Sequence, residues 1–200
     1  MPETPYFVSY SEAVKILESQ PLSLPTEVVS LDDGFNRILS EDLESKVDDP
    51  RFDNSSMDGF AFRHQDSIHP QTRLSIIQTV QAGTKQTSLP IKEGQAVRIM
   101  TGAPIPEGAD AILPIERCEV DEENATVLLF EEGKKHFIRK QGENLGKGQV
   151  ALSKGAHLNP SSIGLCATMG YPEIPVYQQA TIGIISTGDE LKLPGTPLNE

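Results

Sequence analysis

The sequence predicts a protein of mixed α and β class that contains more than one domain. Its 200 residues include 16 glycines and 15 prolines, which favour many short elements joined by turns over a long helical bundle. Helical patterns occur near residues 10–19 and 159–170, and strand patterns fill most of the region between them. A continuous apolar run at residues 180–185 is typical of a buried strand in an α/β domain.

The first predicted element is a helix at about residues 10–19. Ser9 precedes Glu12 by three positions, which is the spacing of a capping box. Apolar residues then recur at helical spacing, and Pro21 is expected to end the helix. The N-terminus therefore predicts a short, amphipathic helix.

Most of the chain after this helix has the pattern of β-structure. Residues 26–31 resemble a strand, and residues 32–39 predict a turn followed by a helical turn. Further strands are expected at residues 60–62, 74–80, 95–100, 111–113 and 125–130. Turns rich in Gly, Pro and Asp separate these strands at short intervals, which favours an antiparallel sheet or barrel.

The C-terminal part of the chain returns to mixed structure. Asn159 as N-cap, Pro160 in the first turn and Gly170 at the end predict a helix between them. Residues 171–177 contain two prolines and predict an extended linker. One strand at residues 180–185 cannot bury itself, so we expect an α/β domain to begin there and to be cut off.

Charge and cysteine content exclude several classes of function. The net charge of -12 is unsuited to nonspecific binding of nucleic acids or anionic membranes, because phosphate contacts need Lys and Arg. No apolar run in the sequence approaches the length of a membrane span. Cys118 and Cys166 lie far apart, which favours a reduced, cytoplasmic protein.

The densest group of polar residues lies at residues 51–61, where Phe52 and Met57 frame a polar loop. Its polar members are Asp53, Asn54, Ser55, Ser56 and Asp58. Such an oxygen-rich loop suits a hard cation or a polar ligand. The alternative is an Asx-rich turn, with Gly59 accepting a positive φ, and local chemistry alone favours this turn.

Two further polar segments follow in the same region. In residues 98–110, Thr101 and Gly102 end a predicted strand. The Thr101 hydroxyl could bond a phosphate or a metal-bound oxygen. Gly102 has no side chain, so a ligand or another backbone could approach it closely. The alternative is a rigid β-connection. Residues 139–148 are basic and Gly-rich but lack the Walker spacing. Arg139 or Lys140 could bind an anion there, and a solvated turn is the alternative.

The last polar segment, residues 186–191, follows the predicted C-terminal strand. Thr187 and Glu190 have capping-box spacing, but Pro194 leaves little room for a helix. Ligands of open α/β sheets bind at the carboxyl ends of strands. Asp189 and Glu190 could there hold Mg²⁺ beside a phosphate.

Taken together, the motifs are far more specific than any one of them. They are Phe52–Ala61, Arg98–Pro104, Gly108–Ala111, Arg139 with Gly142–Glu143, and Ser186–Leu191. In this order they resemble the MoeA family, which includes the gephyrin E domain and comprises molybdopterin molybdenumtransferases. The resemblance runs over essentially the whole chain and covers the N-terminal part of the family.

The resemblance implies an enzyme that transfers molybdenum from molybdate to adenylylated molybdopterin, releases AMP and uses Mg²⁺. It implies a homodimer with its active site at the subunit interface, and it makes the molybdopterin adenylyltransferase a candidate partner. The implied domains are a helical linker or dimerisation domain (1–45 and 146–177), an inserted β-rich domain (46–145), and the first strand and loop of an α/β domain (178–200). The alternative is a non-catalytic dimerisation or partner-binding fragment, and we expect these 200 residues alone to have little activity.

The resemblance also assigns roles to residues. Asp58, Thr101 and Glu190 fall on catalytic positions, and Asp58 and Glu190 would be Mg²⁺ ligands. The residues expected to bind substrate are Asp53, Asn54, Ser55, Ser56, Gly102, Arg139, Asn144, Thr187 and Gly188. Asn144 stands where many members have Asp; its amide keeps an oxygen acceptor but loses the charge, so it would be a weaker Mg²⁺ ligand.

Overall fold

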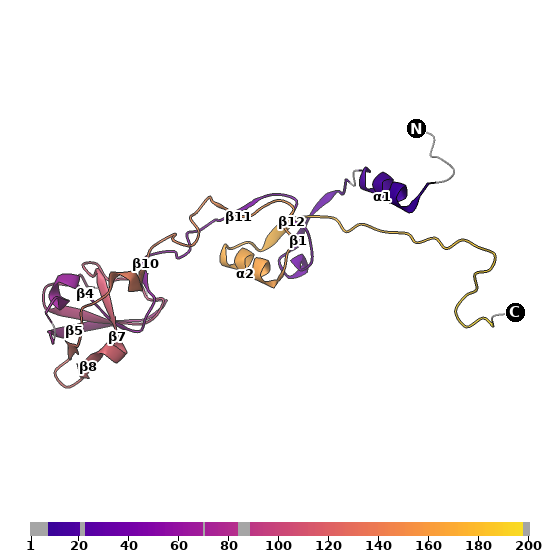
Figure 1. Cartoon of the computed structure of the whole chain (residues 1–200). Helices are drawn as coiled ribbons and strands as arrows, with labels where there is room; N and C mark the ends of the chain where they lie inside the picture. The colour runs from indigo at the N-terminus through magenta and orange to yellow at the C-terminus, as the bar shows by residue number, and fades with distance from the viewer. Residues whose placement is uncertain (1–7, 21–22, 70, 84–88, 198–200) are drawn as a thin grey trace. The chain divides into compact units, whose positions relative to one another are not determined.

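The chain is mostly β with few helices, and it divides into two compact units (Figure 1). The structure, a computed structural model, describes residues 8–20, 23–69, 71–83 and 89–197. The first unit, called the sheet unit, comprises Asp42–Ser153 and Leu165–Tyr171. The second, called the terminal unit, comprises Met1–Glu41, Lys154–Gly164 and Pro172–Glu200. The three-domain boundaries implied by the resemblance stay a prediction.

A six-stranded sheet forms the centre of the sheet unit, with the strand order β7-β4-β6-β5-β9-β8. The strands are β4 (Gly59–Phe62), β5 (Arg73–Val80), β6 (Gln95–Ile99), β7 (Ala111–Pro114), β8 (Cys118–Asp121) and β9 (Thr126–Leu129). The strands expected in these regions are confirmed, whereas β8 was not predicted. Short 3-10 helices lie between or beside them: η2 (His64–Ser67), η3 (Ile115–Arg117) and η4 (Lys135–Phe137).

The sheet is not purely antiparallel, which corrects the expectation from the sequence. β5 and β6 pair in parallel, and the register shifts between Ile76 and Gln78. All other strand pairs in this sheet are antiparallel. Parallel neighbours need a long crossover, and the connection between Val80 and Gln95 is long enough to supply one.

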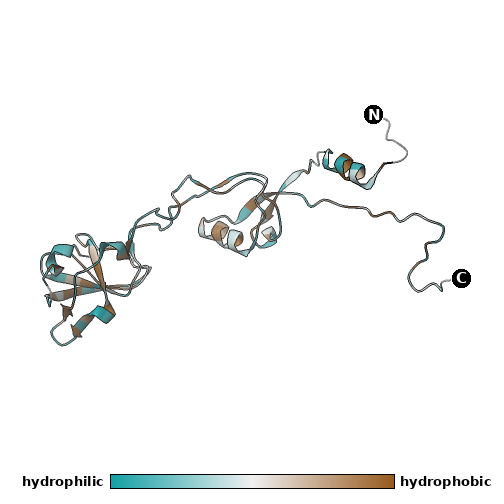
Figure 2. Ribbon diagram, viewed as in Figure 1, coloured by the Kyte–Doolittle hydropathy of each residue, from teal (hydrophilic) through white to brown (hydrophobic). Residues whose placement is uncertain are grey.

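Both faces of the sheet are buried. β4 contributes Phe60 and Phe62 to one core cluster and Ala61 to the other, because successive side chains of a strand point to opposite faces. Figure 2 shows the hydrophobic residues concentrated on these central strands. Burial of a phenylalanine side chain contributes about 1.5–3 kcal/mol. The residues before and after β4 are therefore held on a rigid scaffold.

Two antiparallel segments extend the sheet unit as a ribbon. β2 (Leu43–Glu44) pairs with β11 (Val150–Leu152), and β3 (Asn54–Ser55) pairs with β10 (Ile138–Arg139). The Asp49–Pro50 peptide bond between β2 and β3 is cis. This ribbon places residues 138–147 beside the polar motif of residues 51–61.

The terminal unit contains the predicted N-terminal helix, α1 (Tyr10–Glu18). Ser9 is the N-cap, and its capping box with Glu12 is complete: the Glu12 N–H donates to Ser9 Oγ at 3.3 Å and the Ser9 N–H donates to Glu12 Oε2 at 2.9 Å. Pro21, expected to end the helix, lies outside the described residues. The prediction for residues 32–39 was wrong in its order, because the 3-10 helix η1 (Asp32–Gly34) comes first.

A two-stranded antiparallel sheet replaces the expected linker at residues 171–177. β12 (Glu173–Tyr177) pairs antiparallel with β1 (Thr26–Ser30), with Pro175 opposite Val28. Ile174 and Val176 of β12 are fully buried. Proline is tolerated on edge strands, and both strands of a two-stranded sheet are edges, so the prolines did not exclude a strand.

The helix predicted between Asn159 and Gly170 is confirmed as α2 (Pro160–Thr168), which spans the boundary between the two units. Asn159 Oδ1 accepts a hydrogen bond from the Ser162 N–H at 2.9 Å, as an N-cap should. At the other end, Gly170 has φ +81° and the Tyr171 N–H donates to the Cys166 carbonyl. Both ends of α2 thus follow from sequence signals.

The strand expected at residues 180–185 is absent. In the part of the chain that the structure describes, no strand pairs with this segment, and Ile182, Ile184 and Ile185 are exposed. An apolar run forms a strand only when neighbouring strands satisfy its backbone, and no described strand lies beside residues 180–185 in this way. Among the described helices, none has the length and apolar character needed to cross a membrane.

Candidate functional site

Strand pairing brings together two predicted catalytic residues that lie far apart in the sequence. Gly59 at the start of β4 pairs with Ile99 at the end of β6, so the residues just outside these strands meet. Asp58 Oδ1 accepts two hydrogen bonds from Thr101, one from its N–H at 2.7 Å and one from its hydroxyl at 2.8 Å. Both residues are exposed at this edge. They form the centre of the candidate site.

A tight turn holds Thr101 in place. The Ala103 N–H donates to the Met100 carbonyl at 3.0 Å, and Gly102 between them has φ +80°. A type II turn requires this φ at its third residue, which favours glycine. A Cβ on Gly102 would meet only the Ala82 Cβ, at 3.7 Å. Gly102 is therefore needed for its backbone conformation rather than for close approach of another group.

At Gly59, glycine is needed for close packing rather than for its backbone conformation. A Cβ at this position would run into the backbone of Leu113 and Pro114 on β7, whereas its φ is not positive. The expectation of a positive φ at Gly59 was therefore wrong. Glycine here lets β7 pack closely against the first residue of β4, directly after Asp58.

The carboxyl group of Asp58 is held in its ionised form. The hydrogen bond from the Thr101 backbone N–H, and then the one from its hydroxyl, lower the pKa of Asp58, whereas desolvation opposes them. Hydrogen bonds to a carboxylate favour the charged state. The site thus presents an exposed, fixed negative charge.

The two serines of this motif bond to the main chain, whereas Asn54 is buried. The Ser55 hydroxyl donates to the Met57 carbonyl at 2.6 Å, and the Ser56 hydroxyl donates to the Phe137 carbonyl at 2.9 Å. Asn54 is 9% exposed, and its Oδ1 has no hydrogen-bond partner among the described residues. These three residues, expected to bind substrate, shape the loop that ends at Asp58.

An ion pair and a backbone hydrogen bond join Asp53 to the basic segment at the end of β10. Asp53 Oδ2 lies 2.7 Å from Lys140 Nζ, and Asp53 Oδ1 accepts from the Gln141 N–H at 2.9 Å. The Lys140 side chain is the main cause that lowers the pKa of Asp53. Arg139 Nε donates to Glu143 Oε1 at 3.2 Å. The anion contact expected of Arg139 or Lys140 stays a prediction, since both side chains are paired with carboxylates here.

Asn144 lies in the same ribbon and forms hydrogen bonds with Asp49 on the opposite segment. Its Nδ2 donates to Asp49 Oδ2 at 3.0 Å, and its N–H donates to the Asp49 carbonyl at 3.0 Å. The Asn144 amide therefore serves as a donor to a carboxylate. An aspartate at this position would place two carboxylates side by side.

The remaining predicted residues belong to the terminal unit. Thr187, Gly188 and Glu190 are exposed and lie outside any helix or strand. Gly188 has φ +143°, and the Glu190 carboxylate lies against it. The Leu191 N–H donates to the Gly188 carbonyl at 3.2 Å, which closes a turn. No helix begins at Thr187, so the capping-box alternative fails.

Asp58 could supply one oxygen ligand to a hard cation, but it does not form a complete cation site by itself. Carboxylate and hydroxyl oxygens suit Mg²⁺, which is usually bound through one or two carboxylates together with substrate phosphates. Within residues 8–20, 23–69, 71–83 and 89–197, no group of three His, Cys, Asp or Glu side chains could hold a metal ion alone. Asp58 can thus supply one ligand, and the others would come from a substrate or another carboxylate.

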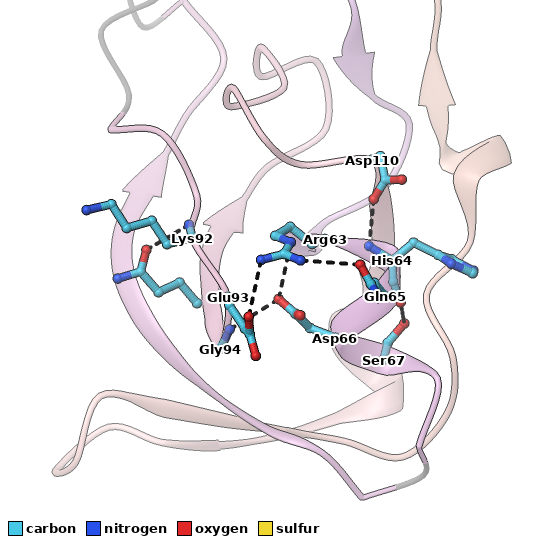
Figure 3. Close-up of polar contacts among 10 residues, drawn as sticks. Arg63, His64, Gln65, Asp66, Ser67, Lys92, Glu93, Gly94 and Asp110 are labelled. Carbon is cyan, nitrogen blue, oxygen red and sulfur yellow. Dashed lines mark hydrogen bonds and ion pairs between the residues drawn. The ribbon is translucent and has the colours of Figure 1, made fainter.

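A second polar cluster, around η2, was not predicted from the sequence (Figure 3). Asp66 Oδ2 accepts from the Gly94 N–H at 3.2 Å, and Asp110 Oδ1 accepts from the His64 N–H at 2.6 Å. Arg63 lies 3.9 Å from both Asp66 and Glu93. A cleft of about 320 Å³ beside it is lined by Arg63, Gln65, Asp66, Ile68, His69 and Glu93. These hydrogen bonds and ion pairs link η2 to two loops of the sheet.

Comparison with known proteins places the chain in a family. The family described as MoeA N-terminal region (domain I and II) matches residues 8–170. The molybdopterin molybdenumtransferase of Haemophilus influenzae is 41% identical over 185 residues, covering 92% of this chain and 45% of that protein. The protein of the same name from Synechococcus elongatus is 40% identical over 190 residues, covering 92% of this chain and 47% of that protein.

Solved structures agree with this placement. A molybdopterin biosynthesis MoeA protein from Pyrococcus horikoshii superimposes with a TM-score of 0.84 at 30% identity, covering 94% of this chain and 51% of that one. The chain thus spans about half the length of the relatives that it matches. With its family match over residues 8–170 and these relatives, the chain belongs to the MoeA N-terminal family.

Proposed function

We propose that the chain is the N-terminal part of an enzyme of molybdenum cofactor biosynthesis, which transfers molybdenum from molybdate to adenylylated molybdopterin and releases AMP. The observation that carries the proposal is the paired Asp58 and Thr101 within a chain of this family. Relatives of the chain bear the name molybdopterin molybdenumtransferase. A fixed carboxylate at an exposed edge suits a reaction between anionic substrates that share a cation.

The residues of this chain would act by binding and orienting. Asp58, and Glu190 in the terminal unit, are the carboxylates that would hold Mg²⁺. When bound, Mg²⁺ would reduce the repulsion among phosphate and molybdate oxygens. Lys140 and Arg139 offer positive charge beside the polar motif, although each is paired with a carboxylate. No covalent nucleophile is required for this role.

The assembly and location of the protein are part of the proposal. The enzyme would act in the cytoplasm as a homodimer, with its active site at the subunit interface and the molybdopterin adenylyltransferase as a candidate partner. The free cysteines Cys118 and Cys166 and the net charge of -12 are compatible with a reducing compartment and with small anionic substrates rather than nucleic acids.

A chimera tests this function, because the chain spans about half of its relatives. Residues 1–177 would replace the matching part of the H. influenzae enzyme, and molybdenum insertion would be measured with molybdate, Mg²⁺ and adenylylated molybdopterin. We expect activity in the chimera and a loss of more than about tenfold in its Asp58→Asn variant. Asp121→Asn, which removes a half-buried carboxylate of the β8–β9 hairpin, is the matched control.

A folded chimera that lacks activity, or an Asp58→Asn variant as active as the control, would contradict the proposal. The alternative is a non-catalytic dimerisation or partner-binding fragment. Its motive is that the chain spans about half the length of the relatives that it matches. Robust turnover by the 200-residue chain alone would exclude that alternative.

A further inference from the structure

We propose that Thr101 is a positioning residue, which fixes the Asp58 carboxylate by holding one of its oxygens and leaving the other for a ligand. The two donors of Thr101 converge on the same atom, Oδ1, at 2.7 and 2.8 Å. No hydrogen bond to Oδ2 occurs among the described residues. The consequence for catalysis rests on the function proposed above, whereas the positioning itself does not.

In this geometry the Thr101 hydroxyl already uses its one hydrogen in the bond to Asp58. A threonine hydroxyl has a single hydrogen to donate, and here it is directed at Asp58 Oδ1. Phosphate and molybdate oxygens only accept hydrogen bonds. While the bond to Asp58 holds, Thr101 therefore cannot donate to an anionic substrate oxygen, which revises the role expected from the sequence. Its lone pairs remain available to accept a hydrogen bond.

The backbone makes this arrangement rigid. The Met100 N–H donates to the Val80 carbonyl at 3.1 Å, which ties the start of the turn to β5. The Gly102 N–H donates to the Ser55 carbonyl at 2.8 Å, which ties its third residue to β3. The direction of the Thr101 N–H is thus set by two neighbouring strands. On the other side, the Ile115 N–H donates to the Asp58 carbonyl at 3.0 Å and holds the main chain of Asp58.

Three substitutions separate the two donors. Thr101→Ser keeps both, and Thr101→Val keeps the backbone N–H but loses the hydroxyl. Thr101→Pro removes both donors yet suits the second position of a type II turn, where proline is favoured. The residue before it, Met100, directly follows β6, and the extended conformation expected there is compatible with a following proline. The series therefore varies the donors while the turn is retained.

The readout is the titration of the Asp58 carboxyl, followed by ¹³C NMR in the 200-residue chain. Because both bonds lower the pKa of Asp58, we expect that pKa to be unchanged in Thr101→Ser, raised in Thr101→Val and raised further in Thr101→Pro. The Asp121 carboxyl, held by Asn124 and remote in sequence from the turn, serves as an internal control that should not move. A carboxyl pKa of Asp58 equal to that of the parent in Thr101→Val would overturn the inference, even if Thr101→Pro did not fold.

Activity of the chimera gives a second readout. Loss of positioning lowers kcat, whereas loss of a direct contact with substrate raises KM for molybdate or the pterin. We expect Thr101→Val to lower kcat mainly, with Thr101→Ser restoring it. A rise in KM alone would instead assign Thr101 to substrate contact. If the chimera is inactive but the NMR series shifts as expected, the proposed function fails and the positioning role stands.

Discussion

Two carboxylate motifs of this chain have similar compositions and different structural support. Asp58 and Thr101 are joined by two hydrogen bonds at the end of paired strands. Thr187 and Glu190 contain the same kinds of groups, but they lie in an exposed segment without helix or strand. The difference lies in the backbone around them, because β4 and β6 are neighbours in a six-stranded sheet and residues 180–185 pair with no described strand.

The comparison indicates that a polar motif becomes a defined site only when its backbone is fixed from both sides. Asp58 is followed by a strand whose four residues are all buried. Glu190 follows a run in which Ile184 is 91% exposed. Substitutions at matched positions of the two segments should therefore have very different effects.

The largest difference in stability is expected between alanine substitutions of two apolar residues, the buried Phe62 and the exposed Ile184. Phe62→Ala removes a fully buried ring from β4 and should lower the free energy of unfolding by about 3–5 kcal/mol. Ile184→Ala removes an exposed side chain and should change it by less than about 0.5 kcal/mol. Urea unfolding followed by circular dichroism measures both. Comparable losses in the two variants would mean that residues 180–185 are buried in solution.

Much of the sheet could be predicted from the sequence, but the site could not be assembled from it. β5 and β6 carry clear strand patterns, and the capping box at Ser9 is a local signal. The contact between Asp58 and Thr101 depends instead on the register Gly59–Ile99. Register is read from alternation between a buried and an exposed face, and β4 has no such alternation because every residue in it is buried.

Errors in the prediction also have physical causes. The prolines of residues 171–177 favour a linker, whereas the segment forms β12, because an edge strand tolerates proline. The apolar run at residues 180–185 favours a strand, but such a run forms a strand only beside partner strands, and a local sequence pattern does not show these partners. The parallel pairing of β5 with β6 follows from the path of the connection, which composition does not indicate.

A second contrast uses two glycines. Gly59→Ala places a methyl group against the Leu113–Pro114 backbone, so β7 must shift and the cost should be about 1–3 kcal/mol. Gly183→Ala meets nothing within 4 Å and should be nearly neutral. Thermal unfolding measures both, and the Asp58 carboxyl titration shows whether the Gly59 variant also disturbs the site. A neutral Gly59→Ala would contradict the close packing of β4 on β7.

Acid should act on the sheet unit through its paired aspartates. The pKa values of Asp53 and Asp48 are lowered, chiefly by the Lys140 side chain and by the Lys147 N–H respectively. Since folding lowers these pKa values, their stabilising contribution is present above the unfolded value of about 3.9 and is lost as pH falls through the folded values. We expect the melting temperature to fall below about pH 4 for this reason.

Asp53→Asn and Lys140→Gln should each reduce the decrease in melting temperature that occurs as the pH is lowered. Because the two side chains form one ion pair, the double variant should differ little from either single variant. Melting temperatures of all four proteins, measured from neutral to acidic pH, check the coupling. Additive effects of the two substitutions would show that Asp53 draws its stabilisation from groups other than Lys140.

The smallest effect is expected in the ribbon, at Asn144. Asn144→Asp would set a second carboxylate beside Asp49 Oδ2, where the amide now donates at 3.0 Å. Like charges on opposing strands should cost up to about 1 kcal/mol, and the cost should shrink at about 1 M salt. Asn144→Ala loses the hydrogen bond without adding charge, so its smaller loss should not depend on salt. The exchange variant Asp49→Asn/Asn144→Asp restores an amide opposite a carboxylate and should recover the parent melting temperature. If Asn144→Asp is as stable as the parent at low salt, Asn144 does not hold the ribbon through Asp49.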